Sequence, residues 1–125
     1  MYTVAVRQDF VARHFLLALD AGSENQLHSH NYTIEVQLEG KRLDENGYLC
    51  DITEIKSVME TLLARYREQT LNDAPEFAGL NPSVEHFARI FCHSLAEAIQ
   101  APNLSAITIR LWEDENAWAA YRQER

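Results

Sequence analysis

Residues 27–38 read LHSHNYTIEVQL. Polar side chains alternate with apolar ones from Thr33 to Leu38, which is the pattern of a strand with one buried face. Residues two apart in a strand point to the same face and lie about 6–7 Å apart along the backbone. The stretch therefore predicts a strand over 31–39, with His28 and His30 at its head and on one face.

A second β-prone stretch, residues 10–15, contributes His14. Imidazole nitrogens bind Zn²⁺ at about 2.0–2.1 Å, so side chains that share a strand face can converge on one ion. Three neutral imidazoles with an open fourth position are typical of a catalytic zinc rather than a structural one. For His28 and His30 alone, two polar residues on a solvated strand face are the alternative interpretation, and His14 weakens it.

The composition is that of an ordinary soluble globular protein. The chain has 125 residues, of which 46% are hydrophobic and 24% charged, and this length predicts a single domain over 1–125. A net charge of −8 argues against a protein that binds nucleic acid through its phosphates, and against an anionic membrane surface.

The chain shows no signal for export or membrane insertion. No apolar run approaches the length of about 20 residues that a membrane span requires, and the N-terminus lacks the apolar region of a signal peptide. Two cysteines, Cys50 and Cys92, do not make a disulfide framework. We expect a reduced, cytoplasmic protein.

Beyond residue 50 the pattern changes to the i, i+3, i+4 spacing of amphipathic helices. Asp51 and Glu54 resemble a capping box at the start of the first helix. Asn81-Pro82-Ser83 starts the second helix, with Pro82 in its first turn. The apolar stripes are Ile55, Val58, Met59, Leu62 and Tyr66 on the first helix and Val84, Phe87, Ala88, Phe91 and Leu95 on the second.

Two further β segments close the chain, residues 106–112 and 118–121. With strands over 2–15 and 31–39, joined by a turn-rich connection over 20–26, the element order is ββααββ. This order predicts an α+β fold in which a four-stranded antiparallel sheet carries both helices on one face. Such a sheet leaves its edges open, which favours oligomerisation through strand pairing.

Several short motifs resemble one known family in both order and spacing. They are His14 after Ala12-Arg13, residues 28–32 (HSHNY), 47–51 (GYLCD), 70–73 (TLND), 82–85 (PSVE) and Glu113 before Tyr121. The family is that of 6-pyruvoyl-tetrahydropterin synthase and 6-carboxytetrahydropterin synthase. The resemblance implies a T-fold whose sheets assemble into a barrel, usually in a homohexamer made as a dimer of trimers. It also implies Zn²⁺ on His14, His28 and His30, and a pterin pocket at a subunit interface.

The resemblance also implies a chemistry. In the family, zinc binds the side-chain oxygens of 7,8-dihydroneopterin triphosphate and makes nearby protons easier to remove. A cysteine thiolate, helped by an Asp-His pair, then moves the protons and the triphosphate leaves. A glutamate near the C-terminus accepts hydrogen bonds from the pterin ring, and Glu113 matches that position.

Three family positions differ in this chain. Glu24 stands four residues before His28, where the family has its catalytic cysteine, and Arg67 and Glu68 stand where it has the Asp-His pair. Cys50 and Cys92 do not restore the thiol, because Cys50 ends a short segment predicted to be extended and Cys92 falls within the second helix, where a small buried residue is common.

A glutamate in place of the cysteine favours a different reaction. A carboxylate is ionised at neutral pH but is a weaker base than a thiolate. It is poorly suited to removing a proton from carbon, whereas a hydroxyl proton near zinc is easier to remove. Loss of that proton begins a retro-aldol cleavage, and one branch of the family with glutamate at this position forms 6-hydroxymethyl-dihydropterin, a folate precursor.

The leading hypothesis is a zinc-dependent pterin lyase of this family that acts on 7,8-dihydroneopterin triphosphate. Its product is 6-carboxytetrahydropterin for queuosine-type compounds, or the folate precursor if Glu24 is the base. A non-catalytic pterin-binding paralogue and a zinc hydrolase on another substrate are the alternatives. Glu24 and Glu113 also fit ordinary solvated acids, and His86 and His93 are expected to be solvated helix residues without a role.

Overall fold

The computed structural model describes residues 1–19 and 22–125. Asp20 and Ala21, which open the predicted turn-rich connection, lie outside the described residues. The elements are β1 (Tyr2–His14), the 3₁₀ turn η1 (Gly22–Asn25), β2 (His28–Gly40), α1 (Ile52–Leu63), the 3₁₀ turns η2 (Leu71–Asp73) and η3 (Pro75–Phe77), α2 (Val84–Ala98), β3 (Ala106–Trp112) and β4 (Trp118–Glu124).

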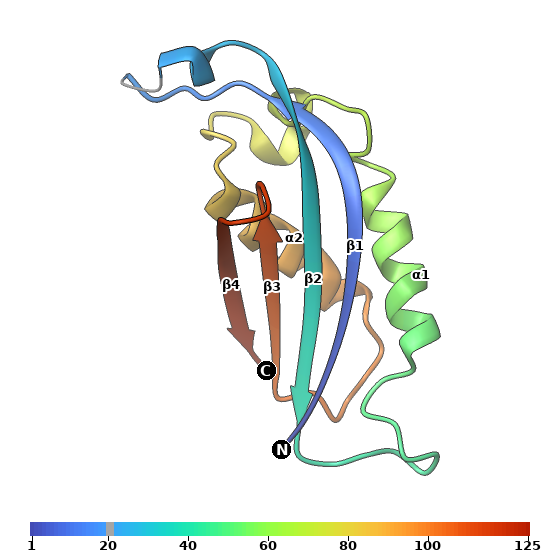
Figure 1. Ribbon diagram of the computed structural model, residues 1–125. Coiled ribbons are helices and arrows are strands. Elements are labelled where there is room, and N and C mark those ends of the chain that lie inside the picture. Colours follow the sequence, from blue (N-terminus) through green and yellow to red (C-terminus); the bar gives the residue numbers. More distant parts are fainter. Residues whose placement is uncertain (20–21) are drawn as a thin grey trace.

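Within the described chain, four strands form one antiparallel sheet in the order β1-β2-β3-β4. Figure 1 shows α1 and α2 together behind this sheet, with α1 beside β1 and α2 behind β3 and β4. The predicted α+β fold, a four-stranded antiparallel sheet with two helices on one face, is confirmed. The order of the strands follows the chain because each pair is joined without a crossover.

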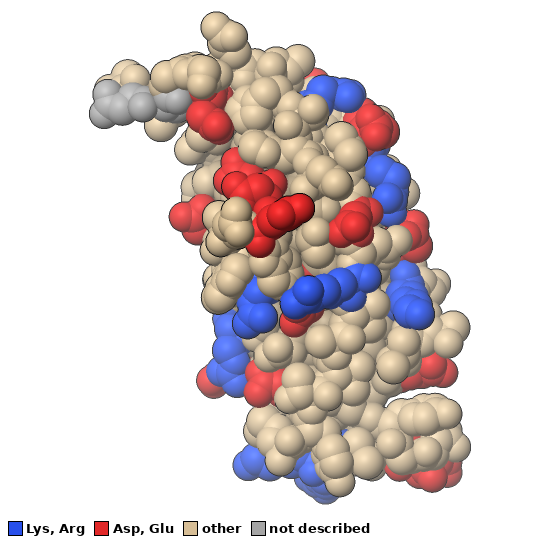
Figure 2. All heavy atoms as spheres, in the orientation of Figure 1, with Lys and Arg blue, Asp and Glu red and all other residues tan. Residues whose placement is uncertain are grey.

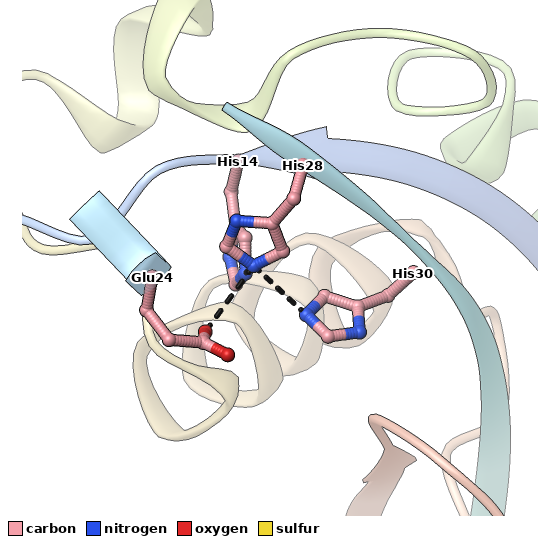
Figure 3. A group of neighbouring side chains, drawn as sticks. All are labelled: His14, Glu24, His28 and His30. Atoms are coloured by element: carbon pink, nitrogen blue, oxygen red, sulfur yellow. Dashed lines mark hydrogen bonds and ion pairs between the residues drawn. The ribbon is translucent and has the colours of Figure 1, made fainter. Parts of the chain in front are cut away.

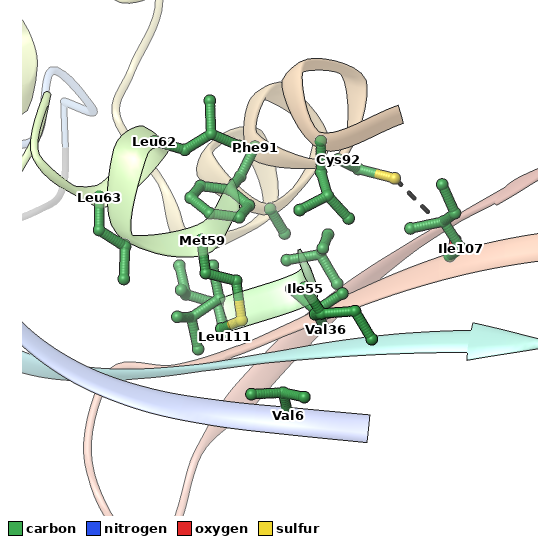
Figure 4. Close-up of a cluster of buried hydrophobic side chains, with 14 of the residues drawn as sticks. Val6, Val36, Ile55, Met59, Leu62, Leu63, Phe91, Cys92, Ile107 and Leu111 are labelled. Atoms are coloured by element: carbon green, nitrogen blue, oxygen red, sulfur yellow. Dashed lines mark hydrogen bonds between the residues drawn. The ribbon is translucent and has the colours of Figure 1, made fainter. Parts of the chain in front are cut away.

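The strand face toward the helices carries the even-numbered residues of β1 and β2. The register pairs Val6 with Val36 and Phe10 with Tyr32, and all four side chains are buried. Figure 4 shows Val6 and Val36 from the sheet facing Ile55 and other apolar residues of the two helices. This core fixes which way every even-numbered residue of the two strands points, because side chains alternate between the faces of a sheet.

Both helices begin at side-chain caps, although one detail of each prediction was wrong. Asp51 caps α1 by accepting a hydrogen bond from the amide of Thr53. Glu54 does not complete a capping box, because its carboxylate instead accepts from the amide of Gln100 at 3.1 Å. Ser83 caps α2, and Pro82 therefore precedes the cap rather than lying in the first turn.

Several other details differ from the prediction. Tyr66 is buried but lies beyond the end of α1, which stops at Leu63. Residues 48–50, predicted to be extended, belong to no strand. Strand β2 begins at His28, three residues before the predicted start, because His28 pairs directly with His14 of β1.

The opposite face of the sheet carries charged side chains in its middle. Glu35 is 5% exposed and is held between Arg7, at 3.0 Å, and Arg110, at 3.8 Å. Figure 2 shows basic side chains across the middle of this view and acidic ones gathered above them, where β3 turns into β4. In the described part of the chain, no helix is long and apolar enough to cross a membrane.

Candidate functional site

The three sequence-predicted histidines lie together at one end of the sheet. Strand β3 pairs with β2 only as far as Thr33, so residues 28–32 of β2 continue beyond it as a two-stranded ribbon with β1. His14 lies opposite His28 in this ribbon, and His30 lies opposite Ala12. All three side chains point to the helix side, and Figure 3 shows their rings converging with Glu24.

The Nε2 atoms of the histidines meet at one point. Nε2 of His28 lies 3.0 Å from Nε2 of His14 and 3.1 Å from Nε2 of His30. Four ligands in a tetrahedron with bonds of about 2.0–2.1 Å lie about 3.3–3.4 Å apart, so these separations are close to those of ligands on one zinc-sized ion.

Backbone carbonyls fix the tautomer of two of the rings. Nδ1 of His14 lies 2.9 Å from the carbonyl oxygen of Pro82, and Nδ1 of His28 lies 2.7 Å from that of Gln26. A carbonyl only accepts, so each Nδ1 carries the proton and donates it. Each Nε2 of the neutral rings is then a bare lone pair. Two lone pairs that face each other at 3.0 Å repel unless a cation lies between them, and metal-binding histidines are oriented by this kind of bond.

Burial favours the neutral form of His14. This residue is 1% exposed, whereas the side chains of His28 and His30 are 26% and 20% exposed. Desolvation lowers the pKa of His14 and the two neighbouring histidines lower it further, against the Pro82 carbonyl and Glu24, which raise it. A neutral imidazole is the form that binds a metal.

Glu24 completes the cluster from η1. Its Oε2 lies 3.2 Å from Nε2 of His28, and one ligand atom from each of His14, Glu24, His28 and His30 lies within 4.8 Å of the others. The donor set of three imidazole nitrogens and a carboxylate oxygen suits Zn²⁺. The residues present therefore fit the zinc that the sequence resemblance implies.

Hydrogen bonds from the loop fix the backbone around Glu24. Its carbonyl oxygen accepts from the amide of Leu16 at 2.7 Å. The side chain of Asn25 donates to the carbonyl oxygens of Leu16 and Ala18, at 3.2 and 3.1 Å. The residues directly after His14 thus hold η1 beside the histidines.

Two asparagines hold the backbone of the segment that follows His14. Oδ1 of Asn72 accepts from the amide of Phe15 at 3.0 Å and its Nδ2 donates to the carbonyl oxygen of Phe15 at 2.9 Å. Asn81 accepts from the amide of Leu17 at 2.7 Å. No function was predicted for these asparagines from the sequence. The Leu-Asn motif was visible, but its partner 57 residues away was not.

Glu113 lies beside the cluster at the end of β3. Its Oε1 is 2.9 Å from Nε2 of His30, and its side chain is 31% exposed. It also lines a cavity of about 140 Å³ with Glu85, Trp118 and other residues. Glu85, in the first turn of α2, was not singled out from the sequence although it belongs to the quoted PSVE motif.

The other residues considered from the sequence contact parts of the protein outside the histidine cluster. Nδ1 of His86 donates to the carbonyl oxygen of Asn81 at 2.8 Å, so this residue is half-buried rather than solvated as predicted. His93 is exposed and its ring stacks edge-on against Tyr121. Arg67 contacts Glu60 at 3.2 Å, and Glu68 pairs with Arg13 at 3.7 Å.

Comparisons with known proteins place the whole chain in one family. A family model described as 6-pyruvoyl tetrahydropterin synthase matches residues 3–124. A protein of Archaeoglobus fulgidus, named as a candidate 6-carboxy-5,6,7,8-tetrahydropterin synthase, is 29% identical over 98 residues, which cover 78% of this chain and 77% of that one.

Solved structures share the fold at low identity. The 6-pyruvoyl tetrahydropterin synthase of Caenorhabditis elegans superposes with a TM-score of 0.84 at 24% identity, covering 98% of this chain and 96% of that one. The Plasmodium vivax 6-pyruvoyltetrahydropterin synthase, solved with a catalytic glutamate replaced by alanine, gives a TM-score of 0.83 at 14% identity, covering 99% and 98%. Because the family model spans nearly the whole sequence, the chain belongs to the 6-pyruvoyl tetrahydropterin synthase family.

Proposed function

We propose that this protein is a zinc-dependent lyase that cleaves 7,8-dihydroneopterin triphosphate by a retro-aldol reaction. In this proposal His14, His28 and His30 hold the metal, Glu113 anchors the pterin and Glu24 is the base. The observation that supports it is the carboxylate of Glu24, 3.2 Å from Nε2 of His28. A carboxylate thus lies beside the candidate metal site, where the family resemblance expects a thiol.

Bound zinc would polarise the side-chain hydroxyls of the substrate and so lower the barrier to losing a hydroxyl proton. The protein's own residues supply the other parts. Glu113 follows Trp112 at the end of β3, so its carboxylate can accept two adjacent N–H groups of a pterin while the pterin side chain reaches the histidines. Glu85, which lines the same cavity, adds a second acceptor.

The reaction balances without an oxidant. Glu24 removes the proton from the hydroxyl on the second side-chain carbon, and a carbonyl forms there. The bond between the first and second side-chain carbons breaks, and its electrons pass into the imine of the dihydropterin ring. Protonation of the first carbon restores the imine and gives 6-hydroxymethyl-dihydropterin, and the leaving fragment is an aldehyde that keeps the triphosphate.

The synthase reactions fit these residues less well. They need a proton to be removed from carbon, for which a carboxylate is a weak base. Arg67 and Glu68, at the positions of the family's Asp-His pair, are engaged with Glu60 and Arg13. The Plasmodium vivax relative, which has a catalytic glutamate, is a precedent for a catalytic carboxylate within this fold.

The proposal extends to the assembly. Strands β1 and β4 are the edges of the sheet, and pairing between them in neighbouring copies would close a barrel. We therefore propose a homohexamer, with the pterin pocket completed at an interface between subunits. Sedimentation or light scattering of the purified protein tests this: a monomer in dilute solution would contradict it.

Product analysis tests the proposed function. Purified, zinc-loaded protein is incubated with 7,8-dihydroneopterin triphosphate and the pterins are identified by chromatography and mass spectrometry. The expected product is 6-hydroxymethyl-dihydropterin, formed together with a phosphorylated aldehyde. 6-Carboxytetrahydropterin or 6-pyruvoyl-tetrahydropterin would contradict the retro-aldol assignment. Unchanged substrate with retained pterin binding would favour the non-catalytic paralogue.

A further inference from the structure

We infer that Glu24 is a ligand of the metal before substrate binds, and that the hydroxyls of the substrate displace it and leave it beside the proton it removes. This inference rests on the zinc site of the proposed function. It assigns the carboxylate two successive positions, first on the metal and then on the substrate.

The geometry that points to a ligand is the position of Glu24 relative to all three histidines. Its Oε2 lies 3.2 Å from Nε2 of His28, close to the edge of about 3.3–3.4 Å expected for a zinc tetrahedron. The carboxylate is also within 4.8 Å of the donor atoms of His14 and His30. It therefore occupies the fourth side of the group that the three imidazoles form, as Figure 3 shows.

Glu113 provides a contrast within the same site. Its Oε1 lies even closer to one histidine, 2.9 Å from Nε2 of His30, yet it is not part of the group whose donor atoms are all within 4.8 Å. The short contact of Glu113 is thus with one histidine, His30, and not with the point on which the donor atoms of all three histidines converge. A short contact to a single ring does not make a ligand, whereas a shared centre does.

Electrostatics favours an anion in the fourth position. The Nδ1 protons of His14 and His28 are committed to the carbonyl oxygens of Pro82 and Gln26, so each ring has only its Nε2 lone pair to offer a cation. Three neutral imidazoles leave the full charge of a divalent ion uncompensated, and His14 is buried, which makes that charge costly. A carboxylate ligand halves the net charge of the site.

The attachment of Glu24 allows the side chain to move while its backbone stays in place. The backbone is fixed through Leu16 and Asn25, as described above. The side chain is 43% exposed, and within residues 1–19 and 22–125 its one polar partner is His28. Rotation of the side chain therefore breaks no other hydrogen bond of the described protein.

A carboxylate suits this exchange better than the family's cysteine would. A thiolate forms a strong bond to zinc and would close the site as in structural zinc centres. A carboxylate has two oxygens and is readily replaced by other oxygen ligands. Because the substrate brings two neighbouring hydroxyls, it can take the position of Glu24, and the released carboxylate then lies next to a hydroxyl that is ready to lose its proton.

Cobalt substitution tests the inference without any catalysis. Co²⁺ is loaded in place of zinc into the full chain, and the visible d–d absorption is recorded without substrate, because its intensity reports coordination number. We expect Glu24→Ala to change the spectrum and to weaken Zn²⁺ binding, measured by competition with a chelator, by about 10- to 100-fold. Added acetate should return the spectrum toward that of the wild type.

Three matched variants sharpen the result. Glu24→Gln keeps the size of the side chain and should also alter the spectrum, which guards against a folding defect in Glu24→Ala. Glu113→Gln and Glu115→Gln remove a charge from the neighbouring turn and should change Zn²⁺ affinity by less than about 2-fold. Added 7,8-dihydroneopterin, which carries the hydroxyls but no triphosphate, should shift the wild-type spectrum.

Identical spectra and Zn²⁺ affinities for wild type and both Glu24 variants would overturn the inference. A spectrum that responds to Glu113→Gln but not to the Glu24 variants would overturn it as well. These outcomes can be told apart from a failure of the proposed function. If product forms but the spectrum does not depend on Glu24, the lyase activity stands and Glu24 is not a metal ligand. If the spectrum depends on Glu24 but no product forms, Glu24 is a metal ligand and the lyase activity is contradicted.

Discussion

The two parts of the candidate site are built in different ways. His14, His28 and His30 stand on β1 and β2, two strands of 13 residues each that pair along their whole length. Glu24 stands on a short 3₁₀ turn in an exposed loop, held by contacts with residues 16–18. The strands give a fixed set of donor atoms, whereas the loop gives a carboxylate that can move. In the proposed site the paired strands therefore supply the histidine ligands of the metal, and the loop supplies the residue proposed to act as the base.

The largest effect is expected for Glu24, the residue on the loop. Glu24→Gln removes the base while keeping its size, so kcat should fall by about 10²- to 10⁴-fold, the usual contribution of a general base. Turnover is measured at saturating substrate and with excess Zn²⁺, so that weaker metal binding does not limit the rate. A rate within a few-fold of wild type would remove Glu24 from the mechanism.

The next effect concerns Glu113, which lies at the end of a strand. A charged hydrogen-bond acceptor is worth about 1.5–3 kcal/mol, so Glu113→Gln should weaken pterin binding by about 10- to 100-fold. Fluorescence titration with 7,8-dihydroneopterin measures this. Glu115→Gln, in the same acidic turn but not lining the cavity with Glu85, is the control. Equal effects of the two changes would show a general loss of charge rather than a pterin anchor.

A third prediction concerns Asn72, which binds the backbone just after His14, where β1 leads into the segment that holds η1. Asn72→Ala removes both hydrogen bonds to Phe15, the residue after His14, and should lower the free energy of unfolding by about 1–3 kcal/mol. Urea denaturation measures this change, with Asn46→Ala in an exposed loop as control. Because Phe15 leads into the segment that holds η1, kcat should fall more than Zn²⁺ affinity does. A fall in Zn²⁺ affinity alone would place the effect of Asn72 on the strands instead.

The smallest effect is expected from the two thiols, which lie away from the site. Burial raises the pKa of Cys50 to about 11, with the nearby Glu54 adding to it, and burial alone raises the pKa of Cys92 to about 11. Native protein should therefore react slowly with a thiol reagent at pH 8 and increasingly as the pH approaches 11, whereas denatured protein reacts at once. Rapid labelling of either thiol at pH 8 would contradict this.

The same shifts have a sign for stability. A raised pKa means that the folded protein keeps its thiol protons where the unfolded chain has lost them. The corresponding stabilisation is complete below the unfolded thiol pKa of about 9 and is lost as the pH rises through about 11. Replacement of Cys92 by Ala should flatten this alkaline loss of stability without changing turnover.

The sequence was sufficient for the sheet because the relevant signals are local. Alternation in residues 33–38 and 106–112 located β2 and β3, and the apolar stripes located both helices. The start of β2 was placed three residues late, since His28-Ser29-His30 has no apolar alternation and is held in the strand by its pairing with β1. Long-range pairing of this kind leaves no mark on a local pattern.

The candidate site was predictable where it coincides with the strands. The three histidines share a strand face, so their convergence followed from period 2 once the pairing was assumed. The proximity of Glu24 to His28 was suggested only by family spacing, because a loop has no periodicity. The hydrogen bonds of Asn72 to Phe15 and the cavity lined by Glu85 and Glu113 join segments that are distant in sequence. They could therefore be found only from the structure.

If the paired strands β1 and β2 hold a metal, the purified protein should contain it. Protein purified without chelators is analysed for zinc by mass spectrometry, together with His28→Ala and with His93→Ala, an exposed histidine on α2, as control. We expect about one zinc per chain in the wild type and in His93→Ala, and a large loss of zinc in His28→Ala. Full zinc occupancy in His28→Ala, or a wild-type protein that takes up no zinc, would contradict it.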